Sequence, residues 1–343
     1  MQKKILVTGQ ISLLLVFLVM LAGSVVRMTG SGMGCPDWPK CFGYYIPPTD
    51  EAQLIWTPNH EYLHGQMIIS NESLLVAGSD FISDEEMNPE NWRVYDKHDY
   101  AIFNPTHTWI EYINRLFGAL SGIPVAVLLV LSLFHVRKDP VNFVLSLLAM
   151  AALGYVAWLG KLVVDGHLIP HSITYHMFGA LAVMFLIIAV IHRNRRTRMI
   201  GIQPSSLLRV LGIVVLLFSL IQIFLGTNVR EEVDAIGSTF ERTQWIDQLG
   251  SLFLFHRSFS IAVVAINAWF IYSLLKIGWP LKWPMVLIAF ISLEIIAGVV
   301  MNYAGFPALM QPVHLLSAIF IGAVQFYLCL QLWFGTSREL VAG

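Results

Sequence analysis

Charged residues are scarce in this chain, and their scarcity excludes most water-soluble folds. Only 13% of the 343 residues are Asp, Glu, Lys or Arg, whereas 56% are hydrophobic, and the mean hydropathy is +0.67. Soluble domains carry roughly 25% charged residues. The composition therefore predicts a polytopic membrane protein, with lipid around it and no nucleic-acid partner. The net charge of -1 is uninformative, because the distribution of charge among the loops carries the information in a membrane protein.

Cysteine is also scarce, since three residues are too few for a disulfide scaffold. Cys35 and Cys41 lie together in a segment rich in Gly and Pro, and their short spacing would allow a bridge outside the cytoplasm. A structural staple, a redox-active pair and two free thiols all remain open for them. Cys329 lies in an apolar run, where we expect it to be a core residue.

What the chain has in abundance is long apolar runs. About 20 residues suffice to cross a bilayer as a helix, and eight runs reach that length. The first follows Lys3 and Lys4 like a signal peptide, but it is too long for one and has no clear cleavage site, so we predict a retained helix. The eight predicted helices are residues 5–26, 108–134, 141–164, 171–191, 207–227, 252–275, 281–301 and 312–334.

The short loops predict the orientation. Basic residues fall on the side of the amino terminus, which the positive-inside rule places in the cytoplasm; they are Lys3, Lys4, Arg137, Lys138, Arg193, Arg195, Arg196, Arg198, Arg209, Lys276 and Lys282. The opposite loops are acidic and include Asp80, Asp84, Glu85, Glu86, Glu90, Glu231, Glu232 and Asp234. We therefore expect an inner (cytoplasmic) membrane protein with both termini in the cytoplasm.

The two halves of the chain resemble each other. Gly23 to Arg27 matches Gly226 to Arg230, and Asn114-Arg115 matches His256-Arg257. Gly160 with Gly298, and His176 with His314, share an offset of 138 residues. This pattern predicts a parallel repeat of two four-helix bundles, residues 1–200 and 201–343. Residues 27–107 form a long first outer loop, which we expect to be functional or folded in its own right.

Histidines inside apolar helices are candidates for a functional site. His256 and His314 are predicted at similar depth near the outer face, where two neutral imidazoles could ligate one haem iron. The alternative is that each histidine bonds to a neighbouring helix. Arg230 and Arg257 could bind haem propionates as charge-assisted pairs, or reach past the apolar region to lipid headgroups.

The first half has Asn114 where the second has His256, so His176 would lack a histidine partner there. A ligand could come from His107 at the mouth of the helix, whose alternative is an interfacial position. Further outer-side histidines are His60, His64, His98, His167 and His171. Glu111 shares a helix face with Asn114 and needs a cavity or a cation such as Arg115. Glu294 could be an internal hydrogen-bond partner or part of a proton path.

Four motifs together resemble the haem A synthase family over nearly all of the chain outside the expanded loop. They are the segment Gly23-Ser-Val-Val-Arg-Met-Thr-Gly-Ser-Gly-Met-Gly-Cys-Pro-Asp-Trp-Pro39, Glu111-Tyr-Ile-Asn-Arg115, Phe255-His256-Arg257, and His314-Leu-Leu-Ser-Ala318. The first of these is long and specific. The resemblance implies oxidation of the C8 methyl group of haem O to a formyl group, which gives haem A for cytochrome oxidases.

The resemblance also implies residue roles. His256 and His314 would hold a haem b cofactor in the second half. Glu111, the Asn114 position and His176 would face the substrate haem, with Arg27 and Arg115 also expected to bind it by analogy with Arg230 and Arg257. Some family members carry a cysteine pair in the first outer loop, matched here by Cys35 and Cys41. Asn114 departs from the expected histidine, and it could donate a hydrogen bond to oxygen bound at an open iron.

We thus predict an all-α haem A synthase with eight transmembrane helices in two pseudosymmetric bundles and haem sites toward the outer face. Expected partners are a haem O synthase that supplies substrate, an electron donor of unidentified kind and, as an option, further copies of the chain. A di-haem b-type electron carrier without haem-modifying activity is the main alternative. A transporter is a third, disfavoured because no helix has a midplane segment broken by Gly and Pro.

Overall fold

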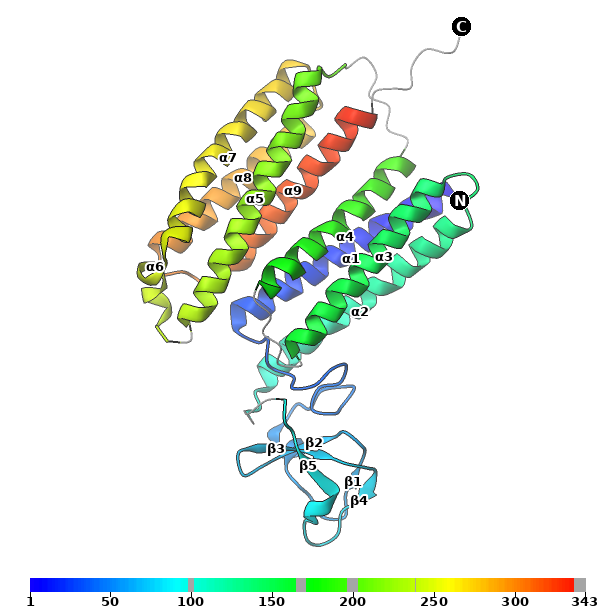
Figure 1. Ribbon diagram of the computed structural model, residues 1–343, viewed down its shortest axis with the longest axis vertical. Helices are drawn as coiled ribbons and strands as arrows, with labels where there is room; N and C mark the ends of the chain where they lie inside the picture. The colour runs from blue at the N-terminus through cyan, green and yellow to red at the C-terminus, as the bar shows by residue number, and fades with distance from the viewer. Residues whose placement is uncertain (98–101, 165–170, 196–202, 238, 336–343) are drawn as a thin grey trace. The chain divides into compact units, whose positions relative to one another are not determined.

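The computed structural model describes residues 1–97, 102–164, 171–195, 203–237 and 239–335 (Figure 1). The chain forms two compact units, which we describe separately. The first comprises Met1–Leu21, Leu120–Tyr155 and the chain from Ile173 onward, and the second comprises Ala22–Ala119 and Val156–Ser172. His98, His167, Arg196 and Arg198 lie outside the described residues.

Within the described residues, eight helices are long and apolar enough to cross a membrane, as predicted. Each begins and ends within a few residues of its predicted run, except α5, which continues about ten residues further. A short helix, α6 (Trp245–Gln248), was not predicted. The eight spans are α1 (Gln2–Thr29), α2 (Pro105–Leu133), α3 (Pro140–Val164), α4 (Ser172–Asn194), α5 (Ser206–Gly237), α7 (Ser251–Lys276), α8 (Lys282–Tyr303) and α9 (Met310–Phe334).

In the first unit, α5 packs on α7 and α9, and α8 packs on α9, so these four helices form a bundle (Figure 1). Their apolar core includes Leu211, Val215, Phe270 and Leu287. Among the polar contacts within this bundle, Gln325 on α9 donates a hydrogen bond to Asn267 on α7 at 2.9 Å. Such bonds satisfy side chains that lipid cannot solvate.

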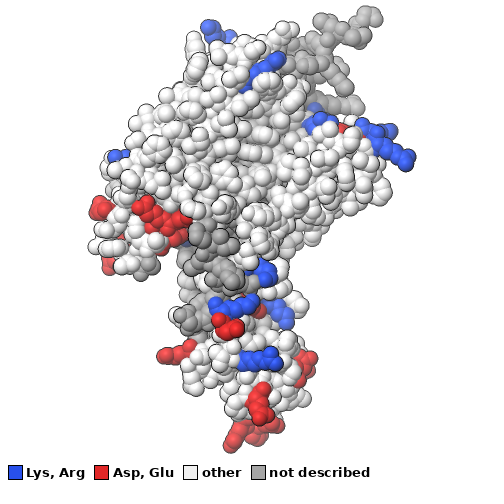
Figure 2. Space-filling view, viewed as in Figure 1, with Lys and Arg blue, Asp and Glu red and all other residues white. Residues whose placement is uncertain are grey.

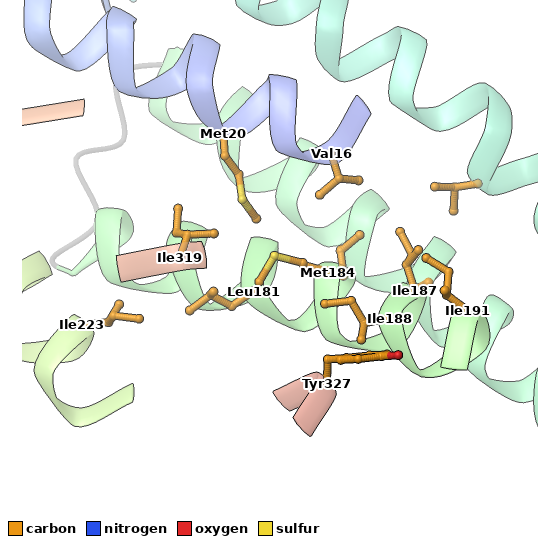
Figure 3. Close-up of a cluster of buried hydrophobic side chains, with 13 residues drawn as sticks. Val16, Met20, Leu181, Met184, Ile187, Ile188, Ile191, Ile223, Ile319 and Tyr327 are labelled. Carbon is orange, nitrogen blue, oxygen red and sulfur yellow. The ribbon is translucent and has the colours of Figure 1, made fainter. Parts of the chain in front are cut away.

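A second apolar cluster joins α1, α4, α5 and α9 within the same unit (Figure 3). Met184, Ile187 and Leu181 from α4 are each at most 1% exposed. Met20 from α1 and Ile319 from α9 belong to the same cluster. Burying side chains of this size contributes about 1.5–3 kcal/mol each in water; in lipid the gain comes from close packing instead.

In the second unit, the outer loop is folded, as its length suggested. A two-stranded antiparallel sheet pairs β1 (Glu61–Tyr62) with β4 (Phe81–Ile82). A three-stranded antiparallel sheet has the order β2 (Met67–Ser70), β3 (Ser73–Ala77), β5 (Trp92–Val94). The β2–β3 turn places Asn71 and Glu72 at φ 48° and 59°, the left-handed conformation that a tight two-residue hairpin requires.

Candidate functional site

The two histidines of the second half lie on α7 and α9, two helices of the same bundle. His256 sits in the second turn of α7 and His314 in the second turn of α9. Their ring centres are 6.4 Å apart, with ring planes inclined at 74°. The sequence prediction that these imidazoles share a site is consistent with this geometry.

Each imidazole has a polar partner on another helix. The side-chain nitrogen of Gln222, on α5, lies 3.4 Å from His256 Nε2 and donates to the His256 carbonyl at 3.1 Å. Nδ1 of His314 lies 3.2 Å from the carbonyl oxygen of Glu294, on α8, and 3.1 Å from its Oε1. The carbonyl oxygen can only accept, so this hydrogen bond requires the proton on Nδ1 of His314 and leaves Nε2 as the atom able to bind a metal.

Glycines make room for both rings. A Cβ added to Gly226, on α5, would lie 3.2 Å from Cε1 of His256, and one added to Gly298, on α8, would lie 3.4 Å from Cε1 of His314. The approach is tight at Gly226, which gives that glycine a steric cause, whereas a Cβ at Gly298 would make an ordinary van der Waals contact with the His314 ring. The α5 and α8 backbones approach the imidazoles closely because no side chain stands between them.

This donor set fits a haem held by two histidines. A metal–imidazole bond is about 2 Å, so two rings on opposite sides of one iron have centres separated by roughly 6 Å, as these do. Nδ1 of His256 is buried and accepts or donates no hydrogen bond among the described residues. The imidazoles therefore combine suitable spacing with one buried nitrogen that still needs a partner.

The two arginines predicted to bind propionates differ in their surroundings. Arg230, on α5, forms an ion pair with Asp234 at 2.6 Å and donates to the side chain of Gln311, which lies one turn before His314 on α9. Arg257 is exposed, with its guanidinium 5.8 Å from the centre of the Phe253 ring. The structure brings Arg230 to the His314 end of α9, and the propionate role of both residues stays a prediction.

In the second unit, Glu111 and Arg115 hold the cysteine loop against α2. Cys35 and Cys41 form a disulfide, so of the three options the structural staple and the redox-active pair remain and the two free thiols do not. The backbone N–H of Cys35 donates to Oε2 of Glu111 at 2.9 Å, while Arg115 pairs with Oε1 at 2.5 Å. Arg115 also donates to the carbonyl oxygens of Asp37 and Lys40 at 2.6 and 2.9 Å.

The close approach of this loop to α2 depends on Gly34. Its carbonyl accepts a hydrogen bond from the Thr108 hydroxyl at 2.7 Å. A Cβ at Gly34 would lie 2.6 Å from the backbone of His107, so no other residue fits without a shift. His107 itself lies in the first turn of α2, and its N–H donates to the side chain of Asn104 at 3.2 Å. Its role as an extra ligand stays a prediction.

Asn114 lies on the same face of α2 as Glu111, as the spacing predicted. Its side-chain oxygen is buried and makes no hydrogen bond within the part of the chain that the structure describes. Gly23, on α1, faces it, because a Cβ there would lie 3.6 Å from Asn114 Oδ1. Arg27 is one turn further along α1 and is exposed. His176 lies on α4 in the first unit, so a site shared with Glu111 and Asn114 stays a prediction.

Sequence reasoning missed two contacts of the histidine site and one of the loop. A polar residue such as Gln222 within an apolar helix was the available signal for the first. Glu294 was noted, but its partner was not. The backbone acceptors of Arg115 have no sequence signal at all, because every residue carries a carbonyl group.

Comparison with known proteins places these features in a family. Residues 7–67 and 82–326 match the family described as cytochrome oxidase assembly protein (COX15-CtaA). The chain belongs to this family. Among curated members, a protein named heme A synthase from Shewanella oneidensis is 26% identical over 76% of this chain and 69% of its own length. The heme A synthase of Rickettsia prowazekii is 22% identical over 91% and 92%, and that of Bacillus pumilus is 25% identical over 52% and 54%.

The matched ranges of this cytochrome oxidase assembly family include every candidate residue of both units. The unmatched stretch, residues 68–81, covers most of β2, all of β3 and the start of β4. Residues 68–81 of the outer loop thus lie outside the family match, and the rest of that loop lies within it.

Proposed function

We propose that this integral membrane protein is a haem A synthase, an oxidoreductase that converts haem O to haem A. The observation that carries the proposal is the family match across residues 7–67 and 82–326, together with relatives that bear this name. The membrane setting follows from the eight apolar helices. The reaction oxidises a methyl carbon of haem O to the aldehyde level, and nothing favours the electron-carrier alternative over it.

His256 and His314 hold the cofactor, a haem b, in this proposal. When bound between two imidazoles, a haem b supplies one-electron transfer. Glu294 fixes the orientation and tautomer of His314 through its carbonyl and carboxylate oxygens, and Gln222 positions the His256 end of the site. Arg230 and Arg257 are the proposed partners of the propionates, and Arg230 would exchange Gln311 or Asp234 for one of them.

Glu111, Asn114 and His176 are the proposed substrate residues, with Arg27 and Arg115 beside them. The unpartnered oxygen of Asn114 is a hydrogen-bond acceptor on the face that Glu111 shares. Arg115 gives the Glu111 carboxylate a charge partner, so this acidic group can persist within an apolar helix. Because Glu111 also accepts the Cys35 N–H, the loop and the substrate residues are held as one assembly.

The orientation follows from charge, in our proposal. Lys and Arg gather at helix ends in the upper part of Figure 2. The eight spans found among the described residues support both termini on one side, and the positive-inside rule favours the cytoplasm for that side. The second turns of α7 and α9 are then near the outer face, where a haem O synthase would deliver its product within the same membrane.

The test is to coexpress the chain with a haem O synthase and identify all extracted haems by chromatography and mass. We expect haem A to accumulate in cells with the unchanged chain. Glu111→Ala should abolish haem A while haem b stays bound, and His256→Ala or His314→Ala should remove haem b. If haem O stays unconverted where a known synthase converts it, the electron-carrier alternative replaces this proposal.

A further inference from the structure

A cavity lies at the end of the first unit that carries the basic loops. Its volume is about 180 Å³, and it is bounded by the end of α4, the start of α8 and the last turns of α9. The side chains that matter are Trp279, Trp283, Tyr327, Gln331, Arg195 and Lys282. None of these belongs to the histidine site, since they lie at the opposite ends of α8 and α9 from Gly298 and His314.

Two residues that line this cavity each carry a buried polar atom without a partner among the described residues. The indole N–H of Trp279 is a donor on a residue that is 3% exposed. The side-chain oxygen of Gln331 is an acceptor on a residue that is 4% exposed, while its nitrogen donates to the Tyr327 hydroxyl at 3.0 Å. Leaving a buried polar group without a hydrogen bond costs about 1–3 kcal/mol of folding free energy. A ligand atom that bonds to either group would therefore be favoured.

Cations stand at the rim. Lys282 and Arg195 are both exposed, and the Lys282 ammonium lies 5.2 Å from the centre of the Trp283 ring. Trp and Lys side chains at a helix end are typical of the interface between apolar core and headgroups. The alternative is that both cations only reach bulk headgroups, but that would leave the two buried atoms unexplained.

The lining specifies the chemistry of the occupant. A phosphate diester accepts from the Trp279 N–H and is attracted by Lys282 and Arg195, whereas the oxygen of Gln331 requires a donor. A headgroup hydroxyl supplies that donor without adding positive charge beside the two cations, which an ammonium would do. We propose that this cavity binds the headgroup of an anionic phospholipid that bears a free hydroxyl, as phosphatidylglycerol does.

The test is native mass spectrometry of the purified full-length protein in detergent, with added phosphatidylglycerol, phosphatidylcholine or inorganic phosphate. We expect one retained phosphatidylglycerol per chain and at least fivefold less phosphatidylcholine. Trp279→Phe, which removes only the N–H, and Lys282→Gln should each lower retention at least fivefold. Lys276→Gln is the matched control, because this exposed lysine lies at the same helix ends outside the cavity.

Three results would overturn the proposal. One is equal retention of the two lipids, and another is the same loss in Lys276→Gln as in Lys282→Gln. The third is displacement of the lipid by inorganic phosphate at equal concentration, which would show an anion site rather than a lipid site. Lys282→Gln changes an exposed side chain, so it tests the site even if Trp279→Phe impairs folding. Lipid binding at this cavity does not depend on the proposed haem chemistry, so each can be tested without the other.

Discussion

The backbone N–H of Cys35 donates a hydrogen bond of 2.9 Å to the carboxylate of Glu111, across 76 residues of sequence. The same carboxylate pairs with Arg115, whose guanidinium also donates to loop carbonyl groups. The disulfide loop and the proposed substrate residues of α2 are therefore parts of one hydrogen-bonded arrangement. A substitution in the disulfide loop should therefore disturb the α2 residues, and a substitution in α2 should disturb the loop.

Removing the Arg115 guanidinium from this arrangement should lower the stability of the fold. Arg115 and Glu111 are 13% and 6% exposed, and breaking a buried ion pair by deleting one partner typically costs about 3–5 kcal/mol. We therefore expect Arg115→Met to lower the unfolding temperature and to speed amide hydrogen exchange in residues 34–41. Adding Glu111→Gln should restore part of the stability, because the unpaired charge is gone. Arg257→Met is the control at an exposed arginine, and equal losses in both variants would contradict the prediction.

Asp37 should make the stability of the outer loop depend on pH. Burial raises the pKa of Asp37 above its ordinary value of 3.8, against the opposing effects of the Gly43 N–H and Arg115. A raised pKa means that the folded state favours the protonated carboxyl. The stabilising contribution is thus present below the unfolded pKa and is lost as pH rises through the folded one.

The measurement is the difference in unfolding temperature between the unchanged chain and Asp37→Asn at several pH values from about 4 to about 7. The amide can still accept the Gly43 N–H, which Asp37 accepts at 3.0 Å, but it cannot ionise. We expect the unchanged chain to lose stability relative to Asp37→Asn as pH increases. A difference that stays constant over this range would refute the assignment.

The helices and the histidine pair could be predicted from sequence, because both depend on local patterns. Hydropathy predicted all eight spans. For α5, however, it predicted an end near Gly226, where the apolar run stops, whereas the helix continues through polar residues to Gly237. The five strands escaped prediction, since strands of two to five residues leave little periodicity. Gln222 and Trp279 gain their meaning only from packing against other helices, which no local pattern records.

The close glycines offer a test of the histidine site. Gly226→Ala would place a Cβ 3.2 Å from the His256 ring, whereas Gly122→Ala, in α2, meets nothing within 4 Å among the described residues. Alanine is favoured over glycine in a helix by about 1 kcal/mol, so neither change should weaken folding through propensity. We expect Gly226→Ala to lower haem b content several-fold, measured by absorption of the purified protein, and Gly122→Ala to leave it unchanged. Full haem content in Gly226→Ala would contradict the proposed role of His256.

Asn114 decides how open the first-half site is. Its side-chain oxygen makes no hydrogen bond among the described residues, so a substitution at position 114 breaks no hydrogen bond made by that oxygen. We expect Asn114→His to supply a second imidazole and give a six-coordinate substrate haem, while the unchanged chain and Asn114→Gln keep a position open to an added ligand such as carbon monoxide. Difference spectra with and without carbon monoxide measure this directly, with the second-half haem as internal reference. An iron that still binds carbon monoxide in Asn114→His would mean that position 114 does not face the iron, and Asn114 would then be a structural residue of α2.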